Sequence, residues 1–199
     1  MSLVSQADAF AAKAHDGMLR KGTNTPYIVH PREAAAIAAS ITDDEHVIAA
    51  ALLHDVMEDC GVTEEELCLR FGKRVAHLVR EETQIQDGDP CKTWDARKKA
   101  AIDRLSKAQR DTKIVALGDK LSNMRAIRRD YELDGEALFH KFHQHDKGRH
   151  AWYYRSILAL LRGELGDTPA FAELEQLIGY VFASVPDIRS LSAEDGFAV

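Results

Sequence analysis

The segment at residues 50–59, with the sequence AALLHDVMED, constrains the fold more than any other part of the chain. Four ionisable side chains, His54, Asp55, Glu58 and Asp59, directly follow apolar residues of the kind that proteins bury. In a helix of about 3.6 residues per turn, side chains four positions apart share a face, so His54 aligns with Glu58 and Asp55 with Asp59. Burying these groups is costly unless a metal ion or charged partners compensate. The segment therefore predicts a helix that carries a functional site.

Most other segments also have helical spacing, and no stretch alternates as a half-buried strand would. Pro31 suits the first position of a helix, and Thr42 or Asp43 is suited to cap the helix that contains residues 50–59. Thr63 starts a capping-box pattern. The remaining helices are predicted at residues 3–15, 33–40, 64–72, 73–83, 94–107, 112–129, 134–147, 149–162 and 168–185. We therefore predict an all-α fold of about ten helices, in a single domain over residues 1–199.

Polar stretches interrupt this helical pattern at three places. Residues 20–26 are predicted to form an irregular loop, and residues 84–92, which contain Gly and Pro, a flexible flap or substrate lid. The tail after about residue 186 is predicted to be loosely packed.

The composition excludes several classes of protein. A formal net charge of −6 argues against non-specific binding of nucleic acid. No apolar run approaches the roughly 20 residues that cross a membrane, and the first ten residues lack the basic start of a signal peptide. Cys60, Cys68 and Cys91 form an odd set without CxxC spacing, which predicts reduced thiols in a cytoplasmic protein. Homo-oligomerisation is left open.

Two further side chains join His54 and Asp55 as candidate metal ligands. His30 stands at the entrance of the helix that Pro31 opens, and Asp119 lies in a helix that is apolar on one side. Two imidazoles and two carboxylates form a mixed nitrogen and oxygen set, which suits divalent cations such as Mn²⁺ or Fe²⁺.

Three ordered motifs carry a resemblance to a known family. They are RKGTNTPYIVHP at residues 20–31, LLHDVMED at residues 52–59 and GDKLSNMR at residues 118–125. In this order they resemble the hydrolase domain of RelA/SpoT proteins, which belongs to the HD-domain superfamily of metal-dependent phosphohydrolases. The length of the chain makes it most similar to the stand-alone small alarmone hydrolases. The resemblance implies an HD-domain helical bundle.

The resemblance also implies a role for each motif residue. His30, His54, Asp55 and Asp119 would bind one Mn²⁺, and Glu58 and Asp59 would orient and activate the attacking water. The predicted nucleotide-binding residues are Arg20, which would pack on the guanine base, Lys21 and Asn123, which would line the pocket, and Lys120, which would offer charge to phosphates. The implied reaction removes the 3′-pyrophosphate of ppGpp or pppGpp, which yields GDP or GTP.

The sequence leaves the substrate open. Relatives often carry a polar residue where this chain has Ala126, and this position lies where the base and sugar would be recognised. The alternatives are pGpp, (p)ppApp, NADPH or a nucleoside monophosphate. A non-catalytic alarmone-binding protein is disfavoured because no candidate ligand is missing. Cys60 is interpreted as a bystander thiol, and the histidines at positions 140, 143, 145 and 150 as surface or interhelical residues.

Overall fold

The computed structural model describes residues 1–84, 89 and 93–186, and these residues form an all-α structure. Within them, ten α-helices and one 3-10 helix confirm the predicted class, and Leu19 and Pro26 form an isolated β-bridge. The helices are α1 (Leu3–Ala14), α2 (Val29–Ala39), α3 (Glu45–Leu53), α4 (Val56–Asp59), α5 (Glu64–Phe71), α6 (Lys73–Glu82), α7 (Trp94–Lys107), α8 (Arg110–Asp134), η1 (Gly135–Lys141), α9 (Lys147–Leu165) and α10 (Pro169–Val181). Most of the predicted lid at residues 84–92, and the tail after residue 186, lie outside the described residues.

Side-chain caps determine where several helices begin. The Thr63 hydroxyl accepts a hydrogen bond from the Glu66 N–H, which confirms the predicted cap of α5. The cap of α3 was predicted wrongly, because Asp44 and not Thr42 or Asp43 accepts the N–H of the first turn. Pro31 is the third residue of α2 and not its first. It is tolerated there because the N–H groups of a first helical turn have no intrahelical acceptor.

The predicted helix at residues 134–147 is wrong. Gly135, with a φ of +56°, ends the long helix α8, and only the short 3-10 helix η1 follows. Helix α9 then begins at Lys147, where the Asp146 carboxylate accepts the N–H groups of Gly148 and Arg149. A left-handed glycine and an aspartate cap therefore divide this region into two elements.

The segment at residues 50–59 is not one continuous helix. Helix α3 ends at Leu53, α4 begins at Val56, and His54 and Asp55 occupy the junction. The His54 Nδ1 lies 2.8 Å from the Ala51 carbonyl oxygen, the group that the Asp55 N–H would bond in a continuous helix. The side chain thus competes with the backbone, and both site residues stand at a helix break.

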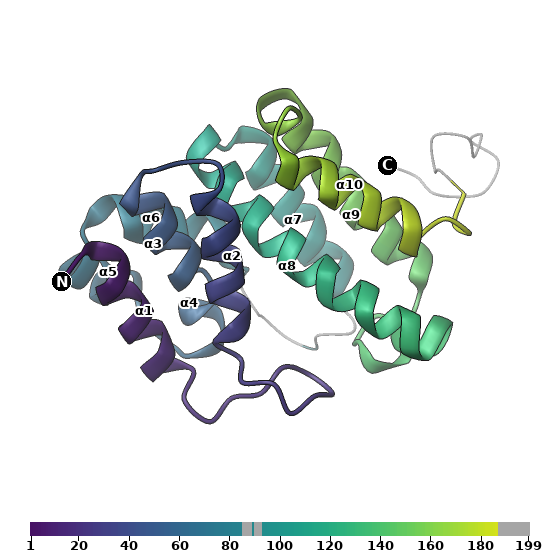
Figure 1. Ribbon diagram of the computed structural model, residues 1–199, viewed down its shortest axis with the longest axis horizontal. Coiled ribbons are helices and arrows are strands. Elements are labelled where there is room, and N and C mark those ends of the chain that lie inside the picture. The colour runs from purple at the N-terminus through teal and green to yellow at the C-terminus, as the bar shows by residue number, and fades with distance from the viewer. Residues whose placement is uncertain (85–88, 90–92, 187–199) are drawn as a thin grey trace.

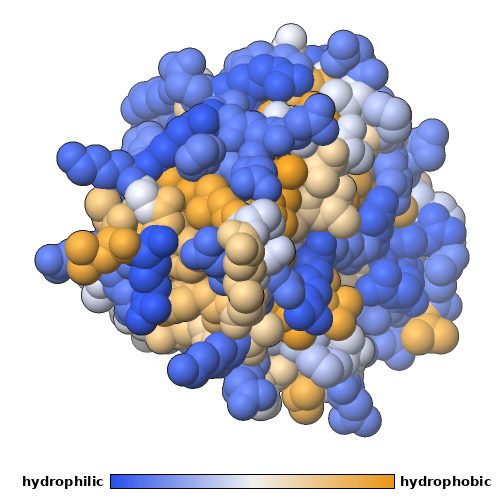
Figure 2. All heavy atoms as spheres, turned by 60° about the vertical axis from the view of Figure 1, so that its left-hand side comes forward, coloured by the Kyte–Doolittle hydropathy of each residue, from blue (hydrophilic) through white to orange (hydrophobic). Residues whose placement is uncertain are grey.

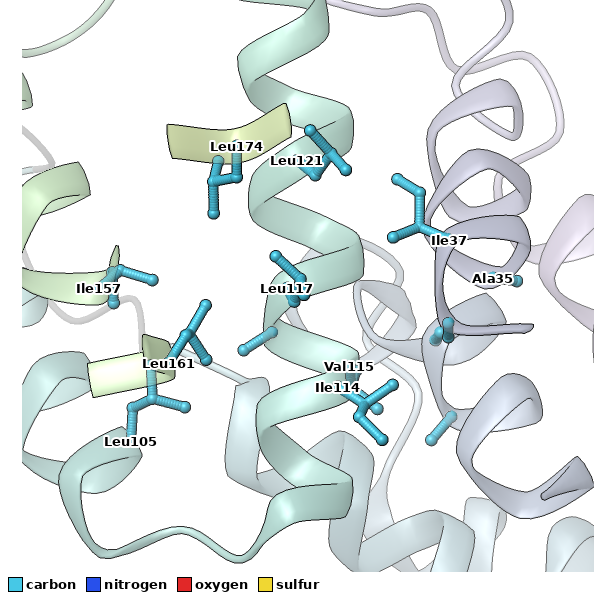
Figure 3. Packing of buried hydrophobic residues seen from close by; sticks show 14 of the residues in the cluster. Ala35, Ile37, Leu105, Ile114, Val115, Leu117, Leu121, Ile157, Leu161 and Leu174 are labelled. Carbon is cyan, nitrogen blue, oxygen red and sulfur yellow. The ribbon is translucent and has the colours of Figure 1, made fainter. Parts of the chain in front are cut away.

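Helix α8 runs through the middle of the molecule, with α2 on one side and α9 and α10 on the other (Figure 1). Figure 3 shows Leu117 and Leu121 of α8 between Ile37 of α2 and Leu174 of α10. All four side chains are at most 5% exposed. Gly118 permits the close approach of α2, because a Cβ there would lie 2.6 Å from the Ala34 carbonyl oxygen.

The surface of the protein is mainly hydrophilic, and one face has apolar residues near its centre (Figure 2). Large apolar side chains that stay exposed among the described residues include Leu19, Leu69 and Leu133. Such exposure is normal on protein surfaces.

No helix in the described ranges has both the length and the apolar character that crossing a membrane requires. A single domain over residues 1–199 stays a prediction.

Candidate active site

Four predicted ligand side chains converge where α2, the α3–α4 junction and α8 meet. The His30 and His54 Nε2 atoms lie 3.1 Å apart. The Asp55 Oδ2 is 3.4 Å from the His30 Nε2 and 3.1 Å from the His54 Nε2. The Asp119 Oδ1 is 3.3 Å from the His30 Nε2 and 3.7 Å from the His54 Nε2. Both histidines are nearly inaccessible to solvent, so the four groups surround a small buried gap.

The other ring nitrogen of each histidine already has a partner. The His54 Nδ1 donates to the Ala51 carbonyl oxygen at 2.8 Å, so the neutral ring, the form that binds a metal, carries its lone pair on Nε2. The His30 Nδ1 lies 2.8 Å from the Ser122 Oγ. Two imidazole lone pairs and two carboxylate oxygens facing one gap form a donor set that fits a divalent cation. Atoms of His30, His54 and Asp55 all lie within 4.8 Å of one another.

The electrostatics of the gap favour positive charge. Burial alone would lower the pKa of His54, but Asp55 and Asp119 outweigh it and raise this pKa well above its usual value. Burial would raise the pKa of Asp55, yet His54 and His30 hold it well below its usual range. For Asp119, Lys120 and the same histidines likewise overcome burial and lower the pKa. A divalent cation would supply the positive charge that these aspartates attract.

Tyr27 connects Asp55 to the predicted catalytic pair. Its hydroxyl donates to the Asp55 Oδ2 at 2.8 Å, and His15 stacks on its ring at 4.8 Å between centroids. Burial and the charges of Asp55 and Asp59 raise the pKa of Tyr27, which keeps the hydroxyl protonated. Desolvation and the charge of Asp55 also raise the pKa of Asp59. Asp59 therefore interacts with the Tyr27 and Asp55 side of the cluster.

Glu58 instead lines a cavity of about 550 Å³ that begins beside His30. Its Oε2 accepts a hydrogen bond of 3.1 Å from the Gln84 N–H. The two predicted catalytic carboxylates thus have different surroundings, although they are neighbours in the sequence.

Three of the four predicted nucleotide-binding residues line this cavity, namely Arg20, Lys21 and Asn123. Arg20 donates to the Asn123 Oδ1 at 2.8 Å, and the Asn123 amide donates to the Asp119 Oδ1. Lys120 does not line the cavity. Its ammonium group is buried against Asp119 and lies 3.7 Å from the Glu82 Oε2. Lys120 is thus placed to hold the candidate ligand Asp119.

Sequence reasoning missed a basic and aromatic wall of the cavity that helices α7 and α9 provide. Its members include Trp94, Arg97, Lys98, Tyr153 and Tyr154. These residues form no motif with the ligands, and their position depends on how α7 packs against α9. The pattern Arg97-Lys98 on one turn of a predicted helix was the one available signal.

Two of the histidines that were interpreted as surface or interhelical residues, His143 and His150, also line the cavity. Burial and the charges of Asp59 and Asp55 raise the pKa of the Cys60 thiol to about 11, so the thiol is neutral and a poor nucleophile. This agrees with its interpretation as a bystander.

The sequence matches the HD domain over residues 7–145, a range that contains all the candidate ligands. The chain belongs to the HD-domain family. A solved HD-domain neighbour, described as a metazoan orthologue of SpoT that hydrolyses ppGpp, has a TM-score of 0.71 at 27% identity and covers 92% of this chain and 96% of that one. This agreement confirms the HD-domain helical fold. Family membership and the cluster of histidines and aspartates together indicate a divalent-metal site.

Two curated relatives differ greatly in length. Human guanosine-3′,5′-bis(diphosphate) 3′-pyrophosphohydrolase MESH1 is 40% identical over 131 residues, which cover 64% of this chain and 70% of that protein. A GTP pyrophosphokinase of Myxococcus xanthus is 36% identical over 132 residues, which cover 64% of this chain but only 17% of that protein. The HD-domain chain therefore spans a small part of the long relatives and most of the short ones.

Proposed function

We propose that this protein is a Mn²⁺-dependent hydrolase that removes the 3′-pyrophosphate of ppGpp and pppGpp, leaving GDP or GTP. The convergence of His30, His54, Asp55 and Asp119 beside a cavity with basic walls is the observation that carries the proposal. The names of the human and metazoan relatives support the choice of substrate.

The four clustered side chains would hold the cation, and the nitrogen and oxygen donor set supports Mn²⁺. When bound, the cation supplies Lewis acidity to a phosphoryl oxygen and to a nearby water. Lys120 and Asn123 hold the Asp119 carboxylate from two sides, so this ligand does not have to reorganise. The Tyr27 hydroxyl donates to the Asp55 carboxylate and likewise holds this ligand in place. The protein thus contributes a rigid, negatively charged cradle.

Glu58 is the proposed proton acceptor for the attacking water, because its carboxylate lines the cavity. Asp59 orients this water together with Tyr27, and its raised pKa suits a group that shares a proton. In phosphoryl transfer the protein contributes chiefly position and charge, so a fixed carboxylate and a fixed cation site are the parts that the chemistry requires.

Cationic side chains on the cavity wall would bind the phosphates. Lys21, Arg97 and Lys98 line the cavity, and this local charge outweighs the formal net charge of −6 for a bound anion. Arg20, whose guanidinium lies 5.5 Å from the centroid of the Tyr27 ring, is the proposed platform for the guanine base. A cytoplasmic location and homo-oligomerisation stay predictions.

A substrate panel tests this function. Purified protein would be incubated with ppGpp, pGpp, ppApp, NADPH and GMP, with Mn²⁺ or with a chelator, and the products resolved by ion-exchange chromatography. The proposal predicts pyrophosphate release from ppGpp that requires the metal. Metal-dependent turnover of another member alone would replace the substrate, and Ala126, which lines the cavity, would be the first position to examine.

A further inference from the structure

A chain of hydrogen bonds runs from His30 through Ser122 to Glu33, and all three residues line the cavity. We propose that Ser122 and Glu33 are positioning residues that hold His30 in the tautomer needed for metal binding. This inference rests on the metal site of the proposed function. The His30 Nδ1 lies 2.8 Å from the Ser122 Oγ, and the Ser122 hydroxyl donates to the Glu33 Oε2 at 2.7 Å.

The carboxylate at the end of this chain determines the direction of each hydrogen bond. A carboxylate only accepts, so the single hydroxyl proton of Ser122 points to Glu33. The Ser122 oxygen is then left to accept from the His30 Nδ1–H. With its proton on Nδ1, His30 presents a lone pair on Nε2 to the gap that it shares with His54.

Arg125 and Glu173 hold Glu33 in place from the outside. The Arg125 NH1 donates to the Glu33 Oε1 at 3.0 Å. Its Nε and NH2 donate to the two Glu173 carboxylate oxygens at 2.7 and 2.6 Å. Glu173 lies on α10, which packs along α8 (Figure 1) and is outside the part of the chain that matches the HD domain. A C-terminal helix of this protein thus supports a ligand on α2.

The decisive variant is Glu33→Gln, which keeps the shape of the side chain and adds an N–H donor. Arg125 would retain the amide oxygen, so the amide NH₂ would face Ser122. The hydroxyl proton would then turn toward His30 and favour the tautomer with a proton on Nε2. We expect Glu33→Gln and Ser122→Ala to weaken Mn²⁺ binding about 10–100-fold, as is typical when the hydrogen-bond partner of a metal ligand is lost.

Mn²⁺ affinity would be measured by isothermal titration calorimetry on the full chain, and circular dichroism would check folding. Ser122→Thr, which keeps the hydroxyl, should restore affinity to within about threefold of wild type. Glu175→Gln is the matched control, because Glu175 accepts from Arg162 on the exposed side of α10 and does not contact the chain behind His30. It should bind Mn²⁺ like wild type.

The outcomes separate this inference from the proposed function. Wild-type Mn²⁺ affinity in folded Glu33→Gln and Ser122→Ala would overturn the inference about His30. A raised KM for ppGpp without loss of metal affinity in these variants would overturn it too. Weakened Mn²⁺ binding in both variants would support it, whether or not the wild-type protein hydrolyses ppGpp. Lack of ppGpp hydrolysis by metal-loaded wild type would instead overturn the proposed function alone.

Discussion

Glu58 and Asp59 illustrate at the residue scale how neighbouring carboxylates acquire different chemistry. Glu58 lines the cavity, whereas desolvation and the charge of Asp55 raise the pKa of Asp59. Groups with different surroundings can divide the tasks of accepting a proton and orienting water. We therefore propose that Glu58, and not Asp59, accepts the proton of the attacking water.

Substitution of Glu58 by Gln should separate chemistry from metal binding. We expect kcat for ppGpp to fall about 10²–10⁴-fold, because the amide cannot accept the proton of the attacking water. Mn²⁺ affinity should stay close to that of wild type, since Glu58 is not among the clustered ligand side chains. Steady-state kinetics and calorimetry measure the two quantities. The exposed Glu65→Gln on α5 is the control, and an unchanged kcat in Glu58→Gln would exclude Glu58 from the mechanism.

Lys98 should make substrate capture depend on pH. Burial and the charge of Lys120 lower its pKa to about 8, so the side chain is charged below that pH and neutral above it. Because the charged form attracts phosphates, kcat/KM for ppGpp should fall as pH rises through about 8, by up to about tenfold per pH unit.

A pair of arginine variants tests this assignment. The arginine of Lys98→Arg stays charged at every accessible pH, so kcat/KM of this variant should not fall as pH rises through about 8. Lys99→Arg, at an exposed position on the same helix, should retain the wild-type profile. Identical pH profiles for wild type and Lys98→Arg would contradict the assignment.

Helix α8 organises the site at the element scale. It carries Asp119, Ser122 and Asn123 past α2, and Gly118 allows the two backbones to approach. Helical spacing predicted this helix, and the order of the motifs predicted which four side chains would cluster as candidate ligands. The wall formed by α7 and α9 was not predictable, because it depends on packing between helices that share no motif. The helix break at His54 also escaped prediction, since it depends on a side chain that bonds the backbone.

The cap of α5 provides a test of the fold that leaves the site intact. Removing the Thr63 hydroxyl leaves the Glu66 N–H without its acceptor, so Thr63→Ala should lower the free energy of unfolding by about 0.5–2 kcal/mol. Urea denaturation measures this change. Thr63→Ser should restore most of the stability, and kcat should be unaffected because α5 carries no site residue. Equal midpoints for the alanine variant and wild type would show that the cap contributes nothing.

At the scale of the whole molecule, the metal site should be coupled to stability. The proposed cation would join α2, the α3–α4 junction and α8, and it would bind only when these elements are folded together. Binding at a hundredfold excess over Kd adds about 2.7 kcal/mol, which corresponds to a rise in Tm of about 5–10 °C for a chain of this size. Differential scanning calorimetry with Mn²⁺ and with chelator measures the rise. Asp55→Ala should lose it, and equal Tm values for wild type in both conditions would contradict the coupling.

The most direct test is to titrate Mn²⁺ into metal-free protein while following pyrophosphate release from ppGpp. We predict that the rate rises with added metal and saturates at one Mn²⁺ per chain. His54→Ala, which removes one of the clustered ligands, should show no such rise. A full rate in metal-free protein, or no release from ppGpp once one Mn²⁺ is bound, would contradict the account.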